Sequence, residues 1–236
     1  MPYRKSKAKK DFDEQASELL NMANSTNLIP LSNLSQSHKE LIYQSIIVLL
    51  SSYIEEYHKA VIEDWYSELC NGNATMGMIS ESSRMFGLMF KIAPTMKGYI
   101  LKEDGEKKLI KNLASKKADL KKFIDDQEKF DLRQFHKNIW GDKKYPSVEN
   151  IKTLYYRLGI DNIFNNINSK GHKSYQLLLK SFTDKREAIA HQGAISLTYN
   201  DAVEQIKSIQ EFVRMLDKEL CSLCCRLAGS NFWPSV

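Results

Sequence analysis

The sequence predicts an all-α protein, a bundle built on long antiparallel helices. Three observations predict this class. Apolar residues recur with a period near 3.6 in several long segments, which is typical of amphipathic helices. The 236 residues include only ten glycines and five prolines, and a chain with so few turn-forming residues favours long helices. No segment alternates polar and apolar residues as a half-buried β-strand would.

The first 30 residues are expected to lie at the edge of the bundle. The start, MPYRKSKAKK, carries five basic residues and no apolar run behind them, so it does not have the pattern of a signal peptide. A helix is predicted over residues 11–24, ending near Pro30. We therefore expect residues 1–30 to be a basic, partly flexible segment and residues 31–236 to be a single helical domain.

The longest helical pattern covers residues 35–70. Its apolar residues cover well over half of the helix circumference: Leu41, Ile42, Ile46, Leu49, Leu50, Tyr53, Ile54, Tyr57, Val61, Ile62 and Trp65. A helix that is apolar on most sides belongs at the centre of a bundle. The turn-forming residues of Asn71-Gly72-Asn73 are expected to end it.

Five further segments are predicted to be helical or largely helical after this central helix. They are 76–92, closed by Pro94; a charged stretch within 102–137; 147–158, capped by Ser147 and ended by Gly159; 172–191, which Gly171 separates from a short preceding segment; and a last helix that starts near Asn200 or Asp201. Side-chain caps and acids in the first turn support the start at Ser147 and the start of the last helix.

The net charge and the cysteines exclude few classes of function. The net charge of +5 and the pI near 8.8 permit a polyanionic partner without requiring one. No apolar run approaches the ~20 residues that cross a bilayer, so we expect a cytoplasmic protein with no membrane partner. Cys221, Cys224 and Cys225 share one helical segment with no second cysteine pair, which favours reduced, packed thiols over a metal site. No cofactor is expected.

A lysine-rich stretch within the charged segment allows two interpretations. Seven lysines fall between Lys107 and Lys122. The first interpretation is a solvated helix face with acids interspersed. The second is a surface for phosphate groups, which would use Lys116, Lys117, Lys121 and Lys122.

An arginine interrupts an apolar helical stripe near the end of the chain. On an ideal helix over 172–191, Arg186 falls within the stripe formed by Tyr175, Leu178, Leu179, Phe182 and Ile189. An arginine in that position pairs with a carboxylate, extends its charged end to water, or lines an interface or pocket, because burying it alone is costly. His191 follows in the last turn, before Gly193, and points about 140° away from Arg186 on the same ideal helix.

Glu55 is a possible counterpart on the central helix. It interrupts an apolar line of residues spaced seven apart, which is completed by Leu41, Val48, Ile62 and Leu69. An acid and a base that are both buried in one bundle are natural partners. The alternative for Glu55 is an exposed position beside Lys59, four residues later.

Three stretches together resemble a known superfamily. Arg186 and His191 enclose four residues in DKREAIAHQG, an Arg-x4-His motif at a helix end in an all-α chain. This resembles the HEPN superfamily (higher eukaryotes and prokaryotes nucleotide-binding), and more narrowly its RiboL-PSP-HEPN type. Glu55 in SSYIEEYHKAVIEDW matches an acidic residue of the family's first long helix, and YPSVENIKTLYYRLGI is similar as well. The family usually has asparagine, aspartate or histidine after the arginine, whereas this chain has Glu187.

The resemblance implies a metal-independent endoribonuclease that acts as a homodimer, with the two motifs facing each other in one cleft. His191 would exchange protons with the RNA 2′-hydroxyl, and Arg186 would hold the phosphate. Glu55 and Glu187 would support the site. The type occurs beside prokaryotic RNA-repair and defence genes, so the implied role is a toxin or effector with RNA as substrate and an antitoxin or defence protein as partner.

Two other functions fit the sequence. The first is a HEPN-like module that no longer cuts RNA and instead binds a nucleotide or a protein; Glu187 leaves room for it. The second is a helical interaction protein in which Arg186 and Glu55 form a structural pair.

Overall fold

The computed structural model describes residues 2–101, 105–130, 135–192 and 196–235, and in these ranges it contains helices and no β-strand. The helices are α1 (Lys7–Leu28), α2 (Gln36–Asn71), α3 (Glu81–Ile100), α4 (Glu106–Ser115), α5 (Lys117–Ile124), α6 (Phe135–Trp140), α7 (Val148–Leu158), α8 (Ile163–Gly171), α9 (Tyr175–Gln192) and α10 (Tyr199–Leu227), with 3-10 turns η1 (Met76–Met78) and η2 (Ser230–Phe232). The predicted all-α class is confirmed.

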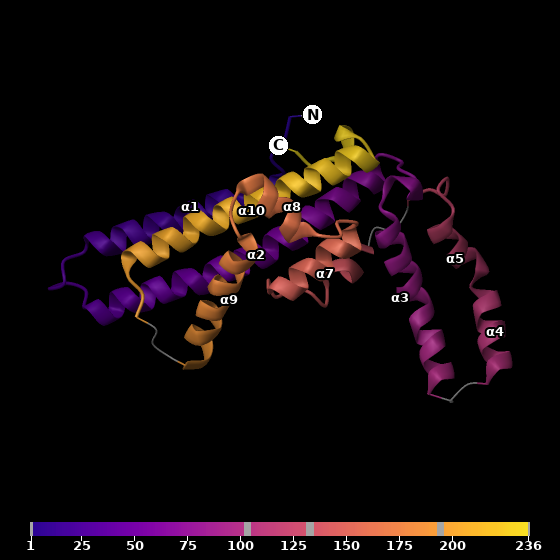
Figure 1. The fold of residues 1–236 in the computed structure, drawn as a ribbon, viewed down its shortest axis with the longest axis horizontal. Coiled ribbons are helices and arrows are strands. Elements are labelled where there is room, and N and C mark those ends of the chain that lie inside the picture. Colours follow the sequence, from indigo (N-terminus) through magenta and orange to yellow (C-terminus); the bar gives the residue numbers. More distant parts are fainter. Residues whose placement is uncertain (1, 102–104, 131–134, 193–195, 236) are drawn as a thin grey trace.

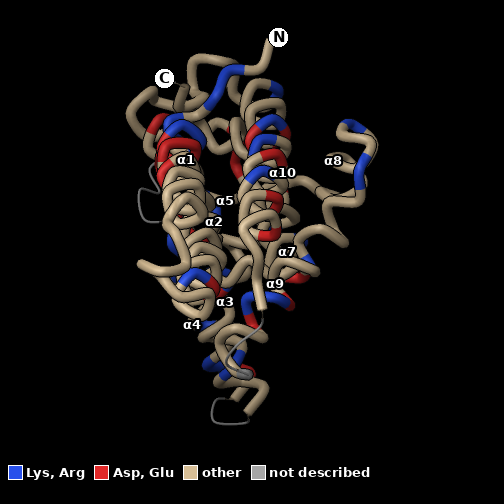
Figure 2. Tube along the Cα trace, turned by 90° about the vertical axis from the view of Figure 1, so that its left-hand side faces the viewer, with Lys and Arg blue, Asp and Glu red and all other residues tan. Residues whose placement is uncertain are grey.

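Three long helices, α1, α2 and α10, lie side by side and form the body of the molecule, with α1 running antiparallel to the other two (Figure 1). The longest, α2, buries residues on successive sides, including Ile46, Ile47, Leu50 and Ile54. Its predicted span and central position are confirmed. Charged residues of both signs lie along α1 and α10 (Figure 2), as expected for helix faces in contact with solvent.

The N-terminal segment lies within the bundle, so the expectation that residues 1–30 are peripheral is wrong. Helix α1 buries Ala8, Phe12, Ala16, Leu19 and Ala23. This face consists mostly of alanine, which forms a weak hydrophobic pattern in the sequence but allows close packing against α2 and α10. The basic residues do not prevent this packing, because Lys9 is buried and its ammonium group pairs with Asp13.

A buried carboxylate attaches the start of the chain to α10. Asp217 is fully buried and accepts hydrogen bonds from the hydroxyls of Tyr3 (2.7 Å), Ser6 (2.5 Å) and Tyr57 (3.1 Å). The backbone amide of Ser6 donates a further bond at 3.1 Å. Buried polar groups satisfied in this way fix the register of the elements that they join.

Helices α3, α4 and α5 form an arm that extends from one end of the body (Figure 1). The predicted helix over 76–92 is corrected here, since α3 begins at Glu81 and continues through Pro94 to Ile100. Proline removes one backbone donor, which leaves the carbonyl of Phe90 without its helical partner. Both residues are exposed, so water can satisfy that carbonyl and the helix continues.

Helices α7, α8 and α9 pack beside the body: α9 contacts α2 and α10, α8 contacts α10, and α7 contacts α3, α8 and α9. As predicted, Ser147 caps α7 and Gly159 ends it; Gly159 has a φ of 100°. A side chain at Gly159 would also collide with Ser80, whose Cβ lies 2.4 Å from the position of an added Cβ. The cap of α10 is corrected to Thr198, which forms a reciprocal capping box with Asp201. Among the described helices, none combines the length and apolar character of a membrane span.

Candidate functional site

Helix α9 carries Arg186 to the surface of α2. Tyr175, Leu179 and Phe182 are fully buried, so the predicted apolar stripe exists and anchors the helix. Arg186 lies one turn beyond Phe182 and is half-buried. The expected position of Arg186 at the end of this stripe therefore agrees with the structure.

Tyr145 forms one wall of the Arg186 environment. The guanidinium carbon lies 5.3 Å from the centre of the Tyr145 ring, within the range of a cation–π contact. The Nε atom of Arg186 is buried without a hydrogen-bond partner among the described residues. The guanidinium therefore contacts a ring face and makes no hydrogen bond with the described residues.

Glu55 on α2 lies near enough to feel the charge of Arg186, but it does not form a close pair with it. Burial raises the pKa of the half-buried Glu55 carboxyl, and the charges of Arg186 and Lys144 counteract part of that rise. In the described part of the chain, no ion pair within 4.0 Å joins Glu55 to Arg186. Lys59 pairs with Glu56 at 3.2 Å, so the alternative pairing of Glu55 with Lys59 is not seen.

Glu187 contacts the same tyrosine from the neighbouring position on α9. The Tyr145 hydroxyl donates a hydrogen bond of 3.2 Å to Glu187 Oε1. Burial first, and then the Glu187 charge, raise the pKa of Tyr145 to about 12, so the phenol keeps its proton at neutral pH. Tyr145 is a site residue that the sequence analysis missed, although it begins the stretch from Tyr145 to Ile160 that carries part of the family resemblance.

His191 lies apart from this cluster. It is exposed in the last turn of α9, and no hydrogen bond or ion pair connects it to another described residue. Arg186, by contrast, faces α2 and Tyr145. One chain therefore brings Arg186, Glu55, Tyr145 and Glu187 together but leaves His191 facing outward. The expected helix end at Gly193 lies outside the described residues.

The predicted phosphate-binding lysines lie on and beside α5, in the arm, well away from α9 (Figure 1). Lys116 is half-buried, and its ammonium group donates to Thr95 Oγ1 at 2.9 Å and holds α5 against α3. Lys117, Lys121 and Lys122 are exposed. Lys121 and Lys122 have acids at 3.6 Å and 4.0 Å, respectively, so these two lysines belong to a mixed, solvated face.

The described residues contain no group of three or more His, Cys, Asp or Glu side chains that could hold a metal ion. Cys70, Cys221 and Cys224 are buried free thiols, and Cys225 is partly buried. The burial of these cysteines agrees with the prediction of packed thiols.

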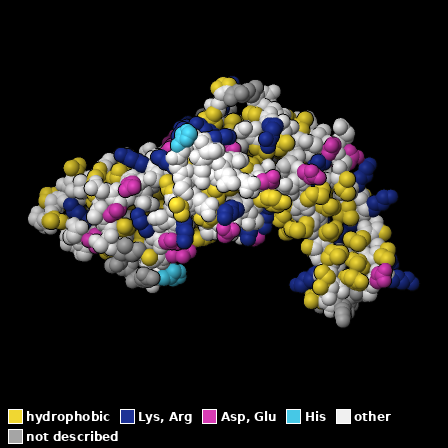
Figure 3. Space-filling model, in the orientation of Figure 1, with side chains coloured by type: hydrophobic (Ala, Val, Ile, Leu, Met, Phe, Trp, Pro, Cys, Tyr) yellow, Lys and Arg dark blue, Asp and Glu magenta, His cyan; other side chains and the backbone are white. Residues whose placement is uncertain are grey.

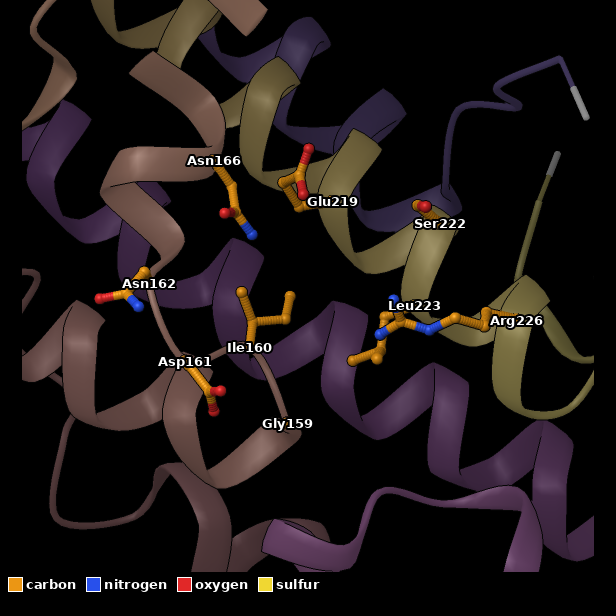
Figure 4. Close-up of a pocket in the computed structure, with 9 residues that line it drawn as sticks. All are labelled: Gly159, Ile160, Asp161, Asn162, Asn166, Glu219, Ser222, Leu223 and Arg226. Atoms are coloured by element: carbon orange, nitrogen blue, oxygen red, sulfur yellow. The ribbon is translucent and has the colours of Figure 1, made fainter. Parts of the chain in front are cut away.

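A polar recess of about 280 Å³ lies away from the motif, lined by the α7–α8 connection, α8 and the end of α10 (Figure 4). Its buried acid, Glu219, is neutralised by an ion pair with Lys170. Arg226 lines the same recess and is exposed. None of the predicted site residues lies in it.

The all-α architecture is the one expected of a HEPN domain. More narrowly, the model of the RiboL-PSP-HEPN family matches residues 10–222, and the chain belongs to that family. The match begins in the first turns of α1 and ends within α10. No curated protein and no solved structure matches the chain.

Proposed function

We propose that this chain is a metal-independent endoribonuclease of the HEPN type. The observation that supports this most directly is the state of Arg186: a half-buried guanidinium on a tyrosine face, with no carboxylate within 4.0 Å among the described residues. A cation with free donors suits a phosphate group. A purely structural Arg186–Glu55 pair would call for a close contact, and the described residues have none.

The proposed reaction uses the nucleophile that RNA already carries. His191 takes the proton of the 2′-hydroxyl, whose oxygen attacks the adjacent phosphorus while the bond to the 5′-oxygen breaks. The leaving 5′-oxygen takes up a proton from a histidine, and Arg186 stabilises the negative charge that grows on the phosphate. The products are a 2′,3′-cyclic phosphate and a 5′-hydroxyl. DNA lacks the 2′-hydroxyl and is not cut.

The tyrosine and the two acids support the site in this proposal. Tyr145 keeps Arg186 oriented, Glu187 holds the Tyr145 hydroxyl, and Glu55 supplies a nearby negative charge that keeps the guanidinium directed toward α2. Cleavage of an unstructured RNA by purified protein in EDTA, followed by end-group analysis for cyclic phosphates, tests the proposal. The role we propose for this activity is that of a toxin or effector of a defence or toxin–antitoxin system.

We propose that the active form is a homodimer joined through α9. His191 faces outward, and Leu177, Ser181, Asp184 and Ala188 share its side of the helix with spacings of three and four residues. Leu177 is exposed although it is apolar, and Ser181 and Ala188 are small enough for close approach. A two-fold axis at this face would bring the two copies of His191 close to each other.

The dimer makes a prediction about mass and activity. Light scattering at micromolar concentration should give about twice the 27.2 kDa of one chain. Leu177→Glu should shift the mass toward the monomer and lower RNA cleavage, because it places charge in the interface. Leu41→Glu is a matched control, since Leu41 is also exposed and apolar but lies on α2. A wild-type chain that is monomeric while it cuts RNA would rule the dimer out.

The arm lysines make a prediction about salt dependence. If Lys117, Lys121 and Lys122 contact RNA, affinity should fall by ~0.7 log units per log unit of salt for each single-strand phosphate neutralised. Charge reversal at these three positions should flatten that slope. Lys116→Glu should flatten it too but should also loosen the arm, because Lys116 bonds to Thr95. Lys10→Glu on α1 is the control, and an unchanged slope in the triple variant would assign the lysines to a solvated face.

The second candidate function is a HEPN-like module that does not cut RNA. The hydrogen bond between Tyr145 and Glu187 favours this function. It gives Glu187, the residue after the motif arginine, a structural partner in place of a role in catalysis. Such a module would bind a nucleotide or a protein at the same surface. Nucleotide-dependent thermal stabilisation without RNA cleavage would identify it.

A further inference from the structure

The arm formed by α3, α4 and α5 exposes an apolar face that its own helices do not cover. Met85, Met89 and Ile100 lie close to one line along α3 at 100° per residue, and all three are exposed. Phe90 beside them is exposed as well. Figure 3 shows hydrophobic side chains covering the visible face of the arm. Apolar patches of this kind mark interaction surfaces in soluble proteins.

This face leads into a groove where α3 meets α7. The groove has a volume of about 680 Å³, and Met85, Phe86, Met89 and Tyr156 provide its apolar lining. Arg157 stiffens one wall: its guanidinium lies 4.3 Å from the centre of the Phe86 ring and binds both carboxylate oxygens of Asp142 at 2.5 and 3.0 Å. The groove is thus preformed, while its methionines can adapt to a partner's side chains.

The arm also carries the positive charge of the protein. Residues 81–124 contain eleven Lys and Arg against five Asp and Glu, a net charge of +6, whereas the whole chain carries +5. The rest of the molecule is therefore close to neutral. Lys97 lies at the edge of the exposed apolar line on α3, and it has no acidic partner among the described residues.

We propose that the α3–α7 groove and the adjoining face of α3 bind an amphipathic helix of a partner protein, with an apolar stripe and acidic flanks. A helix with anchors at i, i+3, i+4 and i+7 fits an apolar groove of this shape. Its acids complement the positive arm and speed association. RNA fits less well, because the charged side chains among the described residues that line the groove are Glu81, an acid, and Arg157, which is already bound by Asp142. A lipid surface is flat and does not fill a groove. The proposal does not depend on ribonuclease activity.

A peptide panel tests the proposal with the full chain. The probe is a fluorescein-labelled helical peptide with leucine at the four anchor positions and glutamate elsewhere. Controls are the same peptide with lysine in place of glutamate, and a version in which prolines break the helix. Fluorescence anisotropy should show saturable binding of the acidic helix, weakened by salt, with at least tenfold weaker binding of both controls.

Variants locate the binding surface. Met85→Gln combined with Met89→Gln should weaken binding of the acidic helix at least tenfold, and because both side chains are exposed the fold should persist. Leu31→Gln with Leu41→Gln is the matched control, with exposed fractions of 63% and 57% against 40% and 53% for the methionines. The proposal fails if the acidic helix does not bind saturably or if both double variants bind equally. It also fails if the methionine variant instead loses binding to phosphatidylglycerol vesicles or to a uridine oligonucleotide.

Discussion

His191→Ala should lower RNA cleavage roughly 10²–10⁴-fold, because it removes the group proposed to move protons to and from the RNA oxygens. The thermal midpoint should stay nearly unchanged. His191 is exposed in the last turn of α9 and makes no hydrogen bond or ion pair with the described residues, so its loss removes little packing. Cleavage by the wild type should persist in EDTA and leave cyclic phosphate ends.

Two further variants separate proton transfer from phosphate binding. His38→Ala replaces another exposed histidine, in the first turn of α2, and should cut RNA as well as the wild type does. Arg186→Lys keeps the charge but loses the planar fork that holds a phosphate through two bonds, so it should also cut poorly. Cleavage by His191→Ala at the wild-type rate would remove the ribonuclease assignment and favour the module that binds without cutting.

The sequence predicted those parts of the fold whose signals are local. The span and central place of α2 followed from apolar residues on most of its sides, and α7 followed from a cap at Ser147 and a left-handed residue at Gly159. The cap of α10 lies two or three residues before the predicted one, because Thr198, Asn200 and Asp201 can all cap a helix. Only the reciprocal bonds of Thr198 and Asp201 decide among them.

The misplaced elements depend on contacts that no local pattern encodes. Helix α1 joins the body through an alanine-rich face and through Asp217, whose hydroxyl donors at Tyr3 and Ser6 are more than 200 residues away in sequence. Pro94 predicts a helix end, but α3 continues through it, because it lies in a projecting arm where water can satisfy the carbonyl that loses its partner.

In the candidate site, too, the sequence predicted what depends on a local pattern and missed what depends on contacts between distant segments. The helical period placed Arg186 on the apolar stripe, and the buried side chains of α9 support that placement. Tyr145 could not be found in this way, because it reaches Arg186 from a connection about 40 residues earlier in the chain. The pattern of one helix also could not show how Arg186 and His191 would act together, because Arg186 faces α2 and His191 faces solvent.

A second large effect is expected on stability at acidic pH, and its cause is His58. This histidine is buried on α2, one turn beyond Glu55. Its Nδ1 lies 2.8 Å from the carbonyl oxygen of Ile54, and its Nε2 has no partner in the described residues. The rings of Tyr57 and Tyr155 surround it without bringing a charge. Burial lowers the pKa of His58 from 6.5 to about 4, so the folded protein holds a neutral imidazole through the mildly acidic range.

The folded protein should therefore lose stability as the pH falls from about 6.5 to about 4. In this range the unfolded chain binds a proton at His58 and the folded chain does not, which favours unfolding. A pKa difference of this size corresponds to roughly 3 kcal/mol in the free energy of unfolding. His58→Gln keeps a donor for the Ile54 carbonyl but cannot titrate, so its loss between pH 7 and pH 4 should be smaller by about that amount. Urea unfolding at both pH values measures the difference, with His38→Gln as the exposed control. Parallel losses in the wild type and in His58→Gln would show that the buried histidine does not set the acid stability of the helix that carries Glu55.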